Sequence, residues 1–116
     1  MTSNVIGGAG VSSSASFEML VCVIVDYLFN EGKIDVVTYA KAGQYAENKY
    51  WLKGSGLLDQ LACAVGGMIT IDFADIENPA IREIKCDFDE MDHDLVIINT
   101  GKGHAEFECR VFCSSE

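Results

Sequence analysis

Apolar residues crowd the segment from Phe17 to Asn30, where only Glu18, Asp26 and the final asparagine interrupt them. Its valine and isoleucine content would suit a strand. The length of the segment and the Gly32 that follows it instead favour a helix. Because the apolar positions run almost all round the helix, we expect it to be buried on most of its sides.

A second helical pattern begins at Asp35, a good N-cap, and ends near Leu52. One stripe of this helix has residues spaced by three and four positions. Its members are Val37, Ala40, Gln44, Glu47 and Trp51. We expect Trp51 to be buried, with Glu47 on the same side.

After the second helix, the chain changes from a helical to an alternating period. A short turn at Lys53 to Gly56 leads into a third helix, Leu57 to Val65, which Gly66 and Gly67 close. The later expectations are strands at Met68–Phe73, Ile84–Phe88 and Leu95–Ile98, a turn at Asn78–Pro79 and a glycine-bearing loop at Asn99–His104. Helices followed by strands predict an α+β fold with helices packed on a mostly antiparallel sheet.

Composition limits the partners that the chain can have. The 116 residues suffice for one small domain or for a piece of a larger one. The 18 acidic and 8 basic residues give a net charge of −10, which argues against nucleic acid and an anionic membrane as partners. Asp26 breaks the longest apolar run well short of a membrane span.

Five cysteines stand apart, without any Cys-x-x-Cys pair, and their number is odd. Free thiols in a reducing cytosol explain this pattern better than a disulfide framework or a zinc site. The first residues also lack the basic segment and cleavage site of a signal peptide. We therefore expect a cytoplasmic protein.

The segment from Gly7 to Ser16 combines glycines and serines immediately before the first helix. Glycines let the backbone approach a ligand closely, and a helix start presents free N–H groups. Together these features predict a phosphate site. The alternative is a flexible linker that merely caps a helix. The loop is not a Walker A motif, since no Gly-Lys-Ser/Thr follows the glycines.

Three segments in register resemble the galactokinases, a group within the GHMP kinases. They are Gly8 to Ser16, Gly56-Leu57-Leu58-Asp59-Gln60 with Ala46-Glu47 twelve residues before Asp59, and Leu95 to His104. The resemblance covers residues 3 to about 105. It implies a partial GHMP kinase fold, made of the N-terminal domain and the start of the C-terminal part.

The resemblance also implies a role for each matching residue. The phosphate-binding residues would be Gly8, Ala9, Gly10, Val11, Ser12, Ser13, Ser14 and Ala15. Ser14 and Glu47 would hold Mg²⁺, with ATP as co-substrate. Asp59 would face the anomeric hydroxyl of galactose, as a base or to orient that hydroxyl. The Gly56 backbone would contact the sugar, where a side chain would intrude.

Elementary chemistry agrees with these roles. Mg²⁺ takes few protein oxygens and keeps waters and phosphate oxygens as its other ligands. An inward Glu47 would be a costly buried charge unless a cation accompanied it. The first turn of a helix favours an ionised Asp59. The alternatives are a surface glutamate at position 47 and an ordinary first-turn aspartate at position 59.

The chain also departs from the galactokinase pattern. It lacks the family's N-terminal sugar-binding segment, its C-terminal half and the proline ahead of the loop glycines. Agreement stops after Ala105. One permitted back-translation of Glu106 to Glu116, read with a one-nucleotide offset, resembles the family's continuation. We expect an internal fragment with a frameshifted tail, and no measurable galactose phosphorylation by this chain alone.

Other functions remain open from the sequence. The protein is either a galactokinase, a non-catalytic relative that binds nucleotide and sugar, or a kinase for another sugar such as N-acetylgalactosamine. The intact run from Ser12 to Ala15 favours catalysis. The acidic run from Asp87 to Asp94 around His93 is a metal site or, more simply, a solvated ridge. His104 contacts a ligand or is a plain loop residue. The sequence leaves the oligomeric state open.

Overall fold

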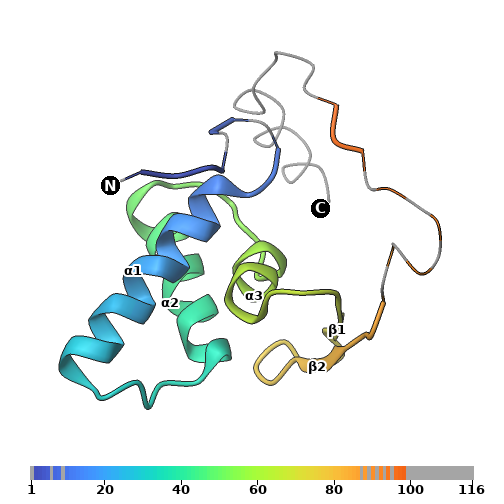
Figure 1. Cartoon of the computed structure of the whole chain (residues 1–116). Helices are drawn as coiled ribbons and strands as arrows, with labels where there is room; N and C mark the ends of the chain where they lie inside the picture. The colour runs from blue at the N-terminus through green and yellow to red at the C-terminus, as the bar shows by residue number, and fades with distance from the viewer. Residues whose placement is uncertain are drawn as a thin grey trace, which may run out of the picture.

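Three helices and a β-hairpin make up the part of the chain that the computed structural model describes, which is residues 2–5, 7–8, 10–86, 88, 90, 92, 94 and 96–98. The helices α1, α2 and α3 pack against one another, and the hairpin follows α3 (Figure 1). The elements are α1 Ser13–Phe29, α2 Val36–Tyr50, α3 Leu58–Val65, β1 Ile69–Asp72 and β2 Ala80–Glu83. The predicted α+β class is confirmed.

Helix α1 begins at Ser13, four residues before the predicted start, and ends at Phe29. The Ser16 N–H donates to the Ser12 carbonyl at 3.0 Å, so Ser13, Ser14 and Ser16 belong to the helix and only Ser12 remains outside it. The prediction of burial on most sides is wrong. The helix buries one stripe, Ala15, Glu18, Met19 and Asp26, because the described part of the chain covers only the side that faces α2 and α3.

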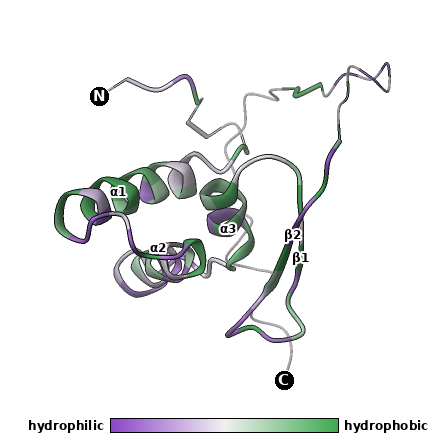
Figure 2. Cartoon of the chain, turned by 60° about the horizontal axis from the view of Figure 1, so that its bottom comes forward, coloured by the Kyte–Doolittle hydropathy of each residue, from purple (hydrophilic) through white to green (hydrophobic). Residues whose placement is uncertain are grey.

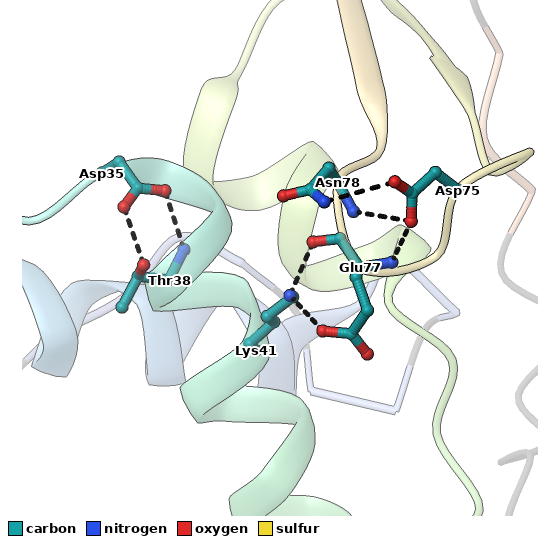
Figure 3. Close-up of polar contacts among 6 residues, drawn as sticks. All are labelled: Asp35, Thr38, Lys41, Asp75, Glu77 and Asn78. Carbon is teal, nitrogen blue, oxygen red and sulfur yellow. Dashed lines mark hydrogen bonds and ion pairs between the residues drawn. The ribbon is translucent and has the colours of Figure 1, made fainter.

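Asp35 caps α2 as predicted. Its carboxylate accepts a hydrogen bond from the Thr38 backbone N–H at 3.0 Å and another from the Thr38 hydroxyl at 2.7 Å (Figure 3). These bonds satisfy donors that a helix start otherwise leaves free. The helix ends with Trp51 as C-cap, whose N–H donates to the Glu47 carbonyl.

Trp51 is 62% exposed, which contradicts the prediction that it is buried. The backbone reverses at Leu52, where φ is +52°. The returning chain then lies against Glu47, whose carbonyl accepts from the Lys53 N–H at 3.2 Å. The loop therefore covers the stripe at Glu47 and leaves the Trp51 side chain outside.

The apolar core lies where α2 and α3 meet the hairpin. Ala40, Leu57 and Leu61 are buried there, and partly buried side chains from the hairpin region pack around them. Helix α3 ends at Val65, and its C-cap Gly66 has φ of +72°, as the predicted glycine stop requires. The core therefore joins the two helices that also carry most of the candidate site.

The hairpin pairs β1 with β2 antiparallel, with Ile71 opposite Ile81. The strand predicted at Ile84–Phe88 is therefore wrong, and Ala80–Glu83 takes its place. The Ile84 N–H still donates to the Met68 carbonyl at 2.8 Å. Beyond that bond the partner strand runs out, because Gly66 and Gly67 both have positive φ and leave the extended conformation.

A polar anchor ties the hairpin loop to α2. Lys41 donates to the Glu77 carbonyl at 2.6 Å and to the Glu77 carboxylate at 2.8 Å (Figure 3). Asp75 accepts from the backbone N–H groups of Glu77 and Asn78, which shapes the turn before Pro79. The predicted turn at Asn78–Pro79 is thus confirmed as part of this loop.

Several predictions concern the end of the chain. Residues 96–98 are not in a strand, which contradicts the expected strand at Leu95–Ile98, and no described strand lies beside them to pair with. Leu95, the loop at 99–104, the tail at 106–116 and much of the acidic run lie outside the described residues. None of the described helices is long and apolar enough to cross a membrane.

Candidate phosphate and metal site

The glycine–serine loop reaches the N-terminus of α1 through an unusual backbone. Gly8 and Gly10 both have φ of +74°, a conformation that glycine adopts without strain. Ser12 has φ of +53°, which is uncommon for a residue with a side chain, and it makes no side-chain capping bond. The Ser12 side chain therefore does not cap the first backbone N–H groups of α1, and these groups can bind an anion.

One pocket of about 210 Å³ lies between the start of α1, the end of α2 and the start of α3. It is lined by Ser14, Ala15, Glu47, Lys53, Gly54, Ser55, Gly56, Leu58, Asp59 and Gln60. The predicted metal ligands, the predicted catalytic carboxylate and the predicted sugar-contacting glycine are thus brought to one place. Three different helices and one loop contribute to it.

The other phosphate-loop residues do not line this pocket. Ser13 lines a second hollow of about 460 Å³ on another side of α1, together with Phe17 and Leu20. Gly8, Gly10, Val11 and Ser12 line neither hollow, and Ala9 lies outside the described residues. Only Ser14 and Ala15 of the predicted phosphate residues therefore reach the site that contains Glu47.

Glu47 is the most enclosed ionisable group of the pocket, at 2% exposed. Its Oε1 accepts from Lys53 Nζ at 3.1 Å, and its Oε2 accepts from Gln60 Nε2 at 3.2 Å. Burial raises the pKa of Glu47, but the polar side chains of Ser55, Lys53 and Ser14 around its carboxylate outweigh burial and leave that pKa lowered. The alternative of a surface glutamate is therefore wrong.

Ser14 and Glu47 bring together two oxygen groups of the kind that Mg²⁺ takes as ligands. The Ser14 hydroxyl is close enough to hydrogen-bond with the Glu47 carboxylate, although the two residues come from different helices. One hydroxyl and one carboxylate beside an open pocket suit an ion that keeps several water or phosphate ligands. Lys53 supplies the positive charge beside Glu47 in this structure.

Asp59 is exposed and lies in the first turn of α3, as predicted. It borders the same pocket as Ser14 and Glu47, so it faces the space that a substrate would fill. Gly56 borders that space too. A Cβ built on Gly56 would meet no atom within 4 Å, so the fold itself does not require glycine there.

Four polar residues for which the sequence predicted no role hold the pocket loop or contact Glu47. Gln44 and Asn48 both donate to the Ser55 carbonyl at 3.2 Å, and the Ser55 N–H donates back to Asn48 at 2.7 Å. Lys53 and Gln60 bind Glu47 directly. In the sequence, only the spacing of Gln44 and Asn48 could have indicated their role, because it puts both on the face of α2 that carries Glu47.

Glu18 is a further buried residue for which the sequence predicted no role. It is 8% exposed, and neither carboxylate oxygen has a hydrogen-bond partner of good geometry among the described residues. Burial, followed by the charge of Glu47, raises the pKa of Glu18. Two buried acidic groups therefore lie close together beneath the pocket.

Comparison with known proteins places these residues in a family. Residues 1–67, more than half of the chain, match the family described as GHMP kinases N terminal domain. The chain is 41% identical over 66 residues to a galactokinase of Clostridium tetani, which covers 57% of the chain and 17% of that protein. It is 34% identical over 101 residues to a galactokinase of Lactobacillus helveticus, covering 87% of the chain and 25% of that protein.

A galactokinase of Ligilactobacillus salivarius is 48% identical over 63 residues, covering 54% of the chain and 16% of that protein. The chain thus spans about a quarter or less of the length of these curated relatives. No solved structure was found to match the chain. The match over residues 1–67 includes the glycine–serine loop, Glu47 and Asp59, and the chain therefore belongs to the GHMP kinase family.

Proposed function

We propose that this chain forms the phosphate-binding, metal-binding and acceptor-facing part of an ATP-dependent kinase whose acceptor is galactose. The observation that carries the proposal is the single pocket that gathers Ser14, Glu47 and Asp59 from three helices. The relatives named galactokinase support the choice of sugar. Free thiols at Cys22, Cys63 and Cys86 support a reducing compartment such as the cytoplasm.

The residues divide the work of phosphoryl transfer, which depends mainly on positioning and on charge neutralisation. The backbone N–H groups at the start of α1 bind phosphate oxygens. Ser14 and Glu47 hold Mg²⁺, which neutralises phosphate charge when bound. Lys53 adds a cation at the edge of the same pocket.

Asp59 acts on the acceptor. A carboxylate that borders the pocket accepts a hydrogen bond from the anomeric hydroxyl of galactose, and it either takes the proton or orients the hydroxyl. The Gly56 backbone leaves room beside it for the sugar ring. The acceptor and the phosphate therefore approach each other between α1 and α3.

A chimera tests this function in the setting of a complete kinase. Residues 1–67 of this chain replace the matching segment of the Clostridium tetani galactokinase, and transfer of phosphate from Mg-ATP to galactose is measured. We expect turnover, and we expect Glu47→Gln and Asp59→Asn each to lower kcat/KM by about 100-fold or more. Glu31→Gln, an exposed carboxylate outside the pocket, is the matched control and should leave turnover unchanged.

Two results would contradict the proposal. One is a folded chimera that binds ADP but transfers no phosphate to galactose. The other is an Asp59→Asn chimera as active as its parent. Preferential turnover of N-acetylgalactosamine would support the kinase activity but show that the acceptor is a different sugar.

A further inference from the structure

Gln60 lines the pocket and lies close to both buried carboxylates, Glu47 and Glu18. It is 1% exposed and immediately follows Asp59 on α3. Its Nε2 donates to Glu47 Oε2 at 3.2 Å, which is a hydrogen bond between α3 and α2. The Gln60 side chain also lies close to Glu18 of α1, since Gln60 Cγ and Glu18 Oε2 both face Gly43 of α2. Gln60 therefore lies where all three helices meet beneath the site.

The packing around Gln60 leaves it little freedom to move. At Gly43 of α2, an added Cβ would lie 2.7 Å from Met19 Cε, 2.9 Å from Glu18 Oε2 and 3.3 Å from Gln60 Cγ. These distances show that Glu18 and Gln60 both pack against Gly43. Because protein interiors are densely packed, a side chain enclosed in this way keeps one orientation.

Two of the polar partners of Glu47 differ in how rigidly they are held. Lys53 reaches Oε1 from a side chain that is 44% exposed, so solvent competes for its ammonium group. Gln60 reaches Oε2 from a fully enclosed position. A neutral amide also binds a carboxylate without cancelling its charge. Glu47 therefore keeps the negative charge that a cation in the pocket requires.

We propose that Gln60 is a positioning residue, which fixes the Glu47 carboxylate beside Ser14 and ties this metal-binding pair to the helix that carries Asp59. This inference rests on the proposed function for the identity of the metal. Residues that orient a metal ligand typically contribute 10–100-fold to metal affinity. Gln60 adds to the roles of Ser14, Glu47 and Asp59 and does not itself contact substrate.

The test compares nucleotide binding with and without metal on the full 116-residue chain. Gln60→Met preserves the length of the side chain and removes its amide. We expect this variant to bind Mn²⁺-ADP about 10-fold more weakly than wild type by calorimetry. Its affinity for ADP in the presence of a chelator should stay within about twofold. A general loss of structure would weaken both affinities together.

Two further variants keep the test decisive. Gln60→Asn is one methylene too short to reach Glu47 and should show the same selective loss, even if the methionine variant folds poorly. Tyr39→Phe is the matched control, since it removes another polar contact between α1 and α2, at a distance from the pocket. It should leave Mn²⁺-ADP binding unchanged. Wild-type affinity for Mn²⁺-ADP in both Gln60 variants would overturn the proposal.

A metal-free readout separates this proposal from the proposed function. A double-mutant cycle in urea, with Gln60→Met, Glu47→Gln and both together, measures their coupling. We expect a coupling of about fivefold or more in the unfolding equilibrium constant. If wild type binds ADP no better with Mn²⁺, the proposed function is contradicted. In that case the double-mutant cycle alone tests the role of Gln60, and absence of coupling between Gln60 and Glu47 would overturn that role.

Discussion

Asp26 is a buried acidic residue that stabilises the turn between two helices rather than the site. It is 1% exposed, near the end of α1. Its Oδ2 accepts from the Ile34 N–H at 3.2 Å and also from the Tyr39 hydroxyl. Asp26 and Glu18 interrupt the apolar run in the sequence, and they are among the residues that α1 buries. At the scale of single residues, polar character therefore did not predict exposure.

The contact between Asp26 and Tyr39 predicts a pH dependence. The hydrogen bond to Asp26, with partial burial and the charge of Asp26, raises the pKa of Tyr39 to about 12. Because the folded state holds this proton more tightly than the unfolded state, the contribution to stability is present below pH 10. It is lost as pH rises from about 10 to about 12.

Ultraviolet titration of the tyrosines measures this effect. Wild type should show one tyrosine that ionises near pH 12, and Tyr39→Phe should remove that transition. Asp26→Asn should move it towards the ordinary tyrosine value. A Tyr39 that ionises together with the other tyrosines would contradict the geometry.

Gly56 separates stability from function at a single position. Because a Cβ there meets no protein atom within 4 Å, we expect Gly56→Ala to change the free energy of unfolding by less than about 0.5 kcal/mol. In the chimera, the added methyl group should obstruct the sugar and raise the KM for galactose by about tenfold. Urea unfolding checks the expected stability, and galactose kinetics check the expected KM. An unchanged KM would show that the sugar lies elsewhere.

At the scale of whole elements, local signals were sufficient for α2 and α3 but not for the hairpin. The N-cap at Asp35 and the stop at Gly66 depend on a few neighbouring residues. The second strand depends on where its partner ends. Residues Ile84 to Phe88 alternate as a strand does, yet among the described residues β1 offers them no partner beyond Met68, because Gly66 and Gly67 leave the extended conformation. Pairing between distant segments does not show in the period of one segment.

The same distinction applies to the site. Ser14, Glu47, Gly56 and Asp59 were predicted through the family resemblance, and the structure brings them to one pocket. Their role as a set remains a proposal. The contacts of Gln60 could not be predicted, because they depend on how closely three helices approach at Gly43.

That close approach predicts the effect of a single methyl group. Alanine favours a helix over glycine by about 1 kcal/mol, whereas overpacking costs about 1–3 kcal/mol. Met19, Glu18 and Gln60 are all buried around Gly43, so they have little room to move away. We expect Gly43→Ala to destabilise the chain by about 1–2 kcal/mol in urea unfolding.

Gly54→Ala is the control for this measurement. A Cβ at Gly54 meets no atom within 4 Å, so the substitution should be nearly neutral. A Gly43→Ala variant as stable as wild type would mean that the helices do not approach as closely as the structure shows.

At the scale of the whole molecule, the described part of the chain leaves much of α1 uncovered. Figure 2 shows hydrophobic colour along most of this helix. Its last turns expose Leu28 at 65% and Phe29 at 80%, and Val21, Ile24 and Val25 are also exposed. Contiguous apolar patches of this kind mark surfaces that associate with other protein or promote aggregation.

This surface predicts the behaviour of the chain in isolation. We expect it to bind a hydrophobic dye and to self-associate as its concentration rises. The double variant Leu28→Glu and Phe29→Glu should reduce self-association in analytical ultracentrifugation, because both side chains are exposed and charge opposes contact between copies. Its far-ultraviolet circular dichroism should not change. If the variant self-associates as strongly as wild type, the surface responsible for self-association lies elsewhere.

The central claim is that the pocket between α1, α2 and α3 holds a metal-bound phosphate. The most direct test is the affinity of the chain for ADP with Mg²⁺ and with a chelator, measured by calorimetry for wild type and for Glu47→Gln. We predict tighter binding with Mg²⁺ for wild type, and loss of that difference in the variant. A wild-type affinity that is the same with Mg²⁺ and with chelator, or a Glu47→Gln variant that keeps the full Mg²⁺ effect, would contradict the claim.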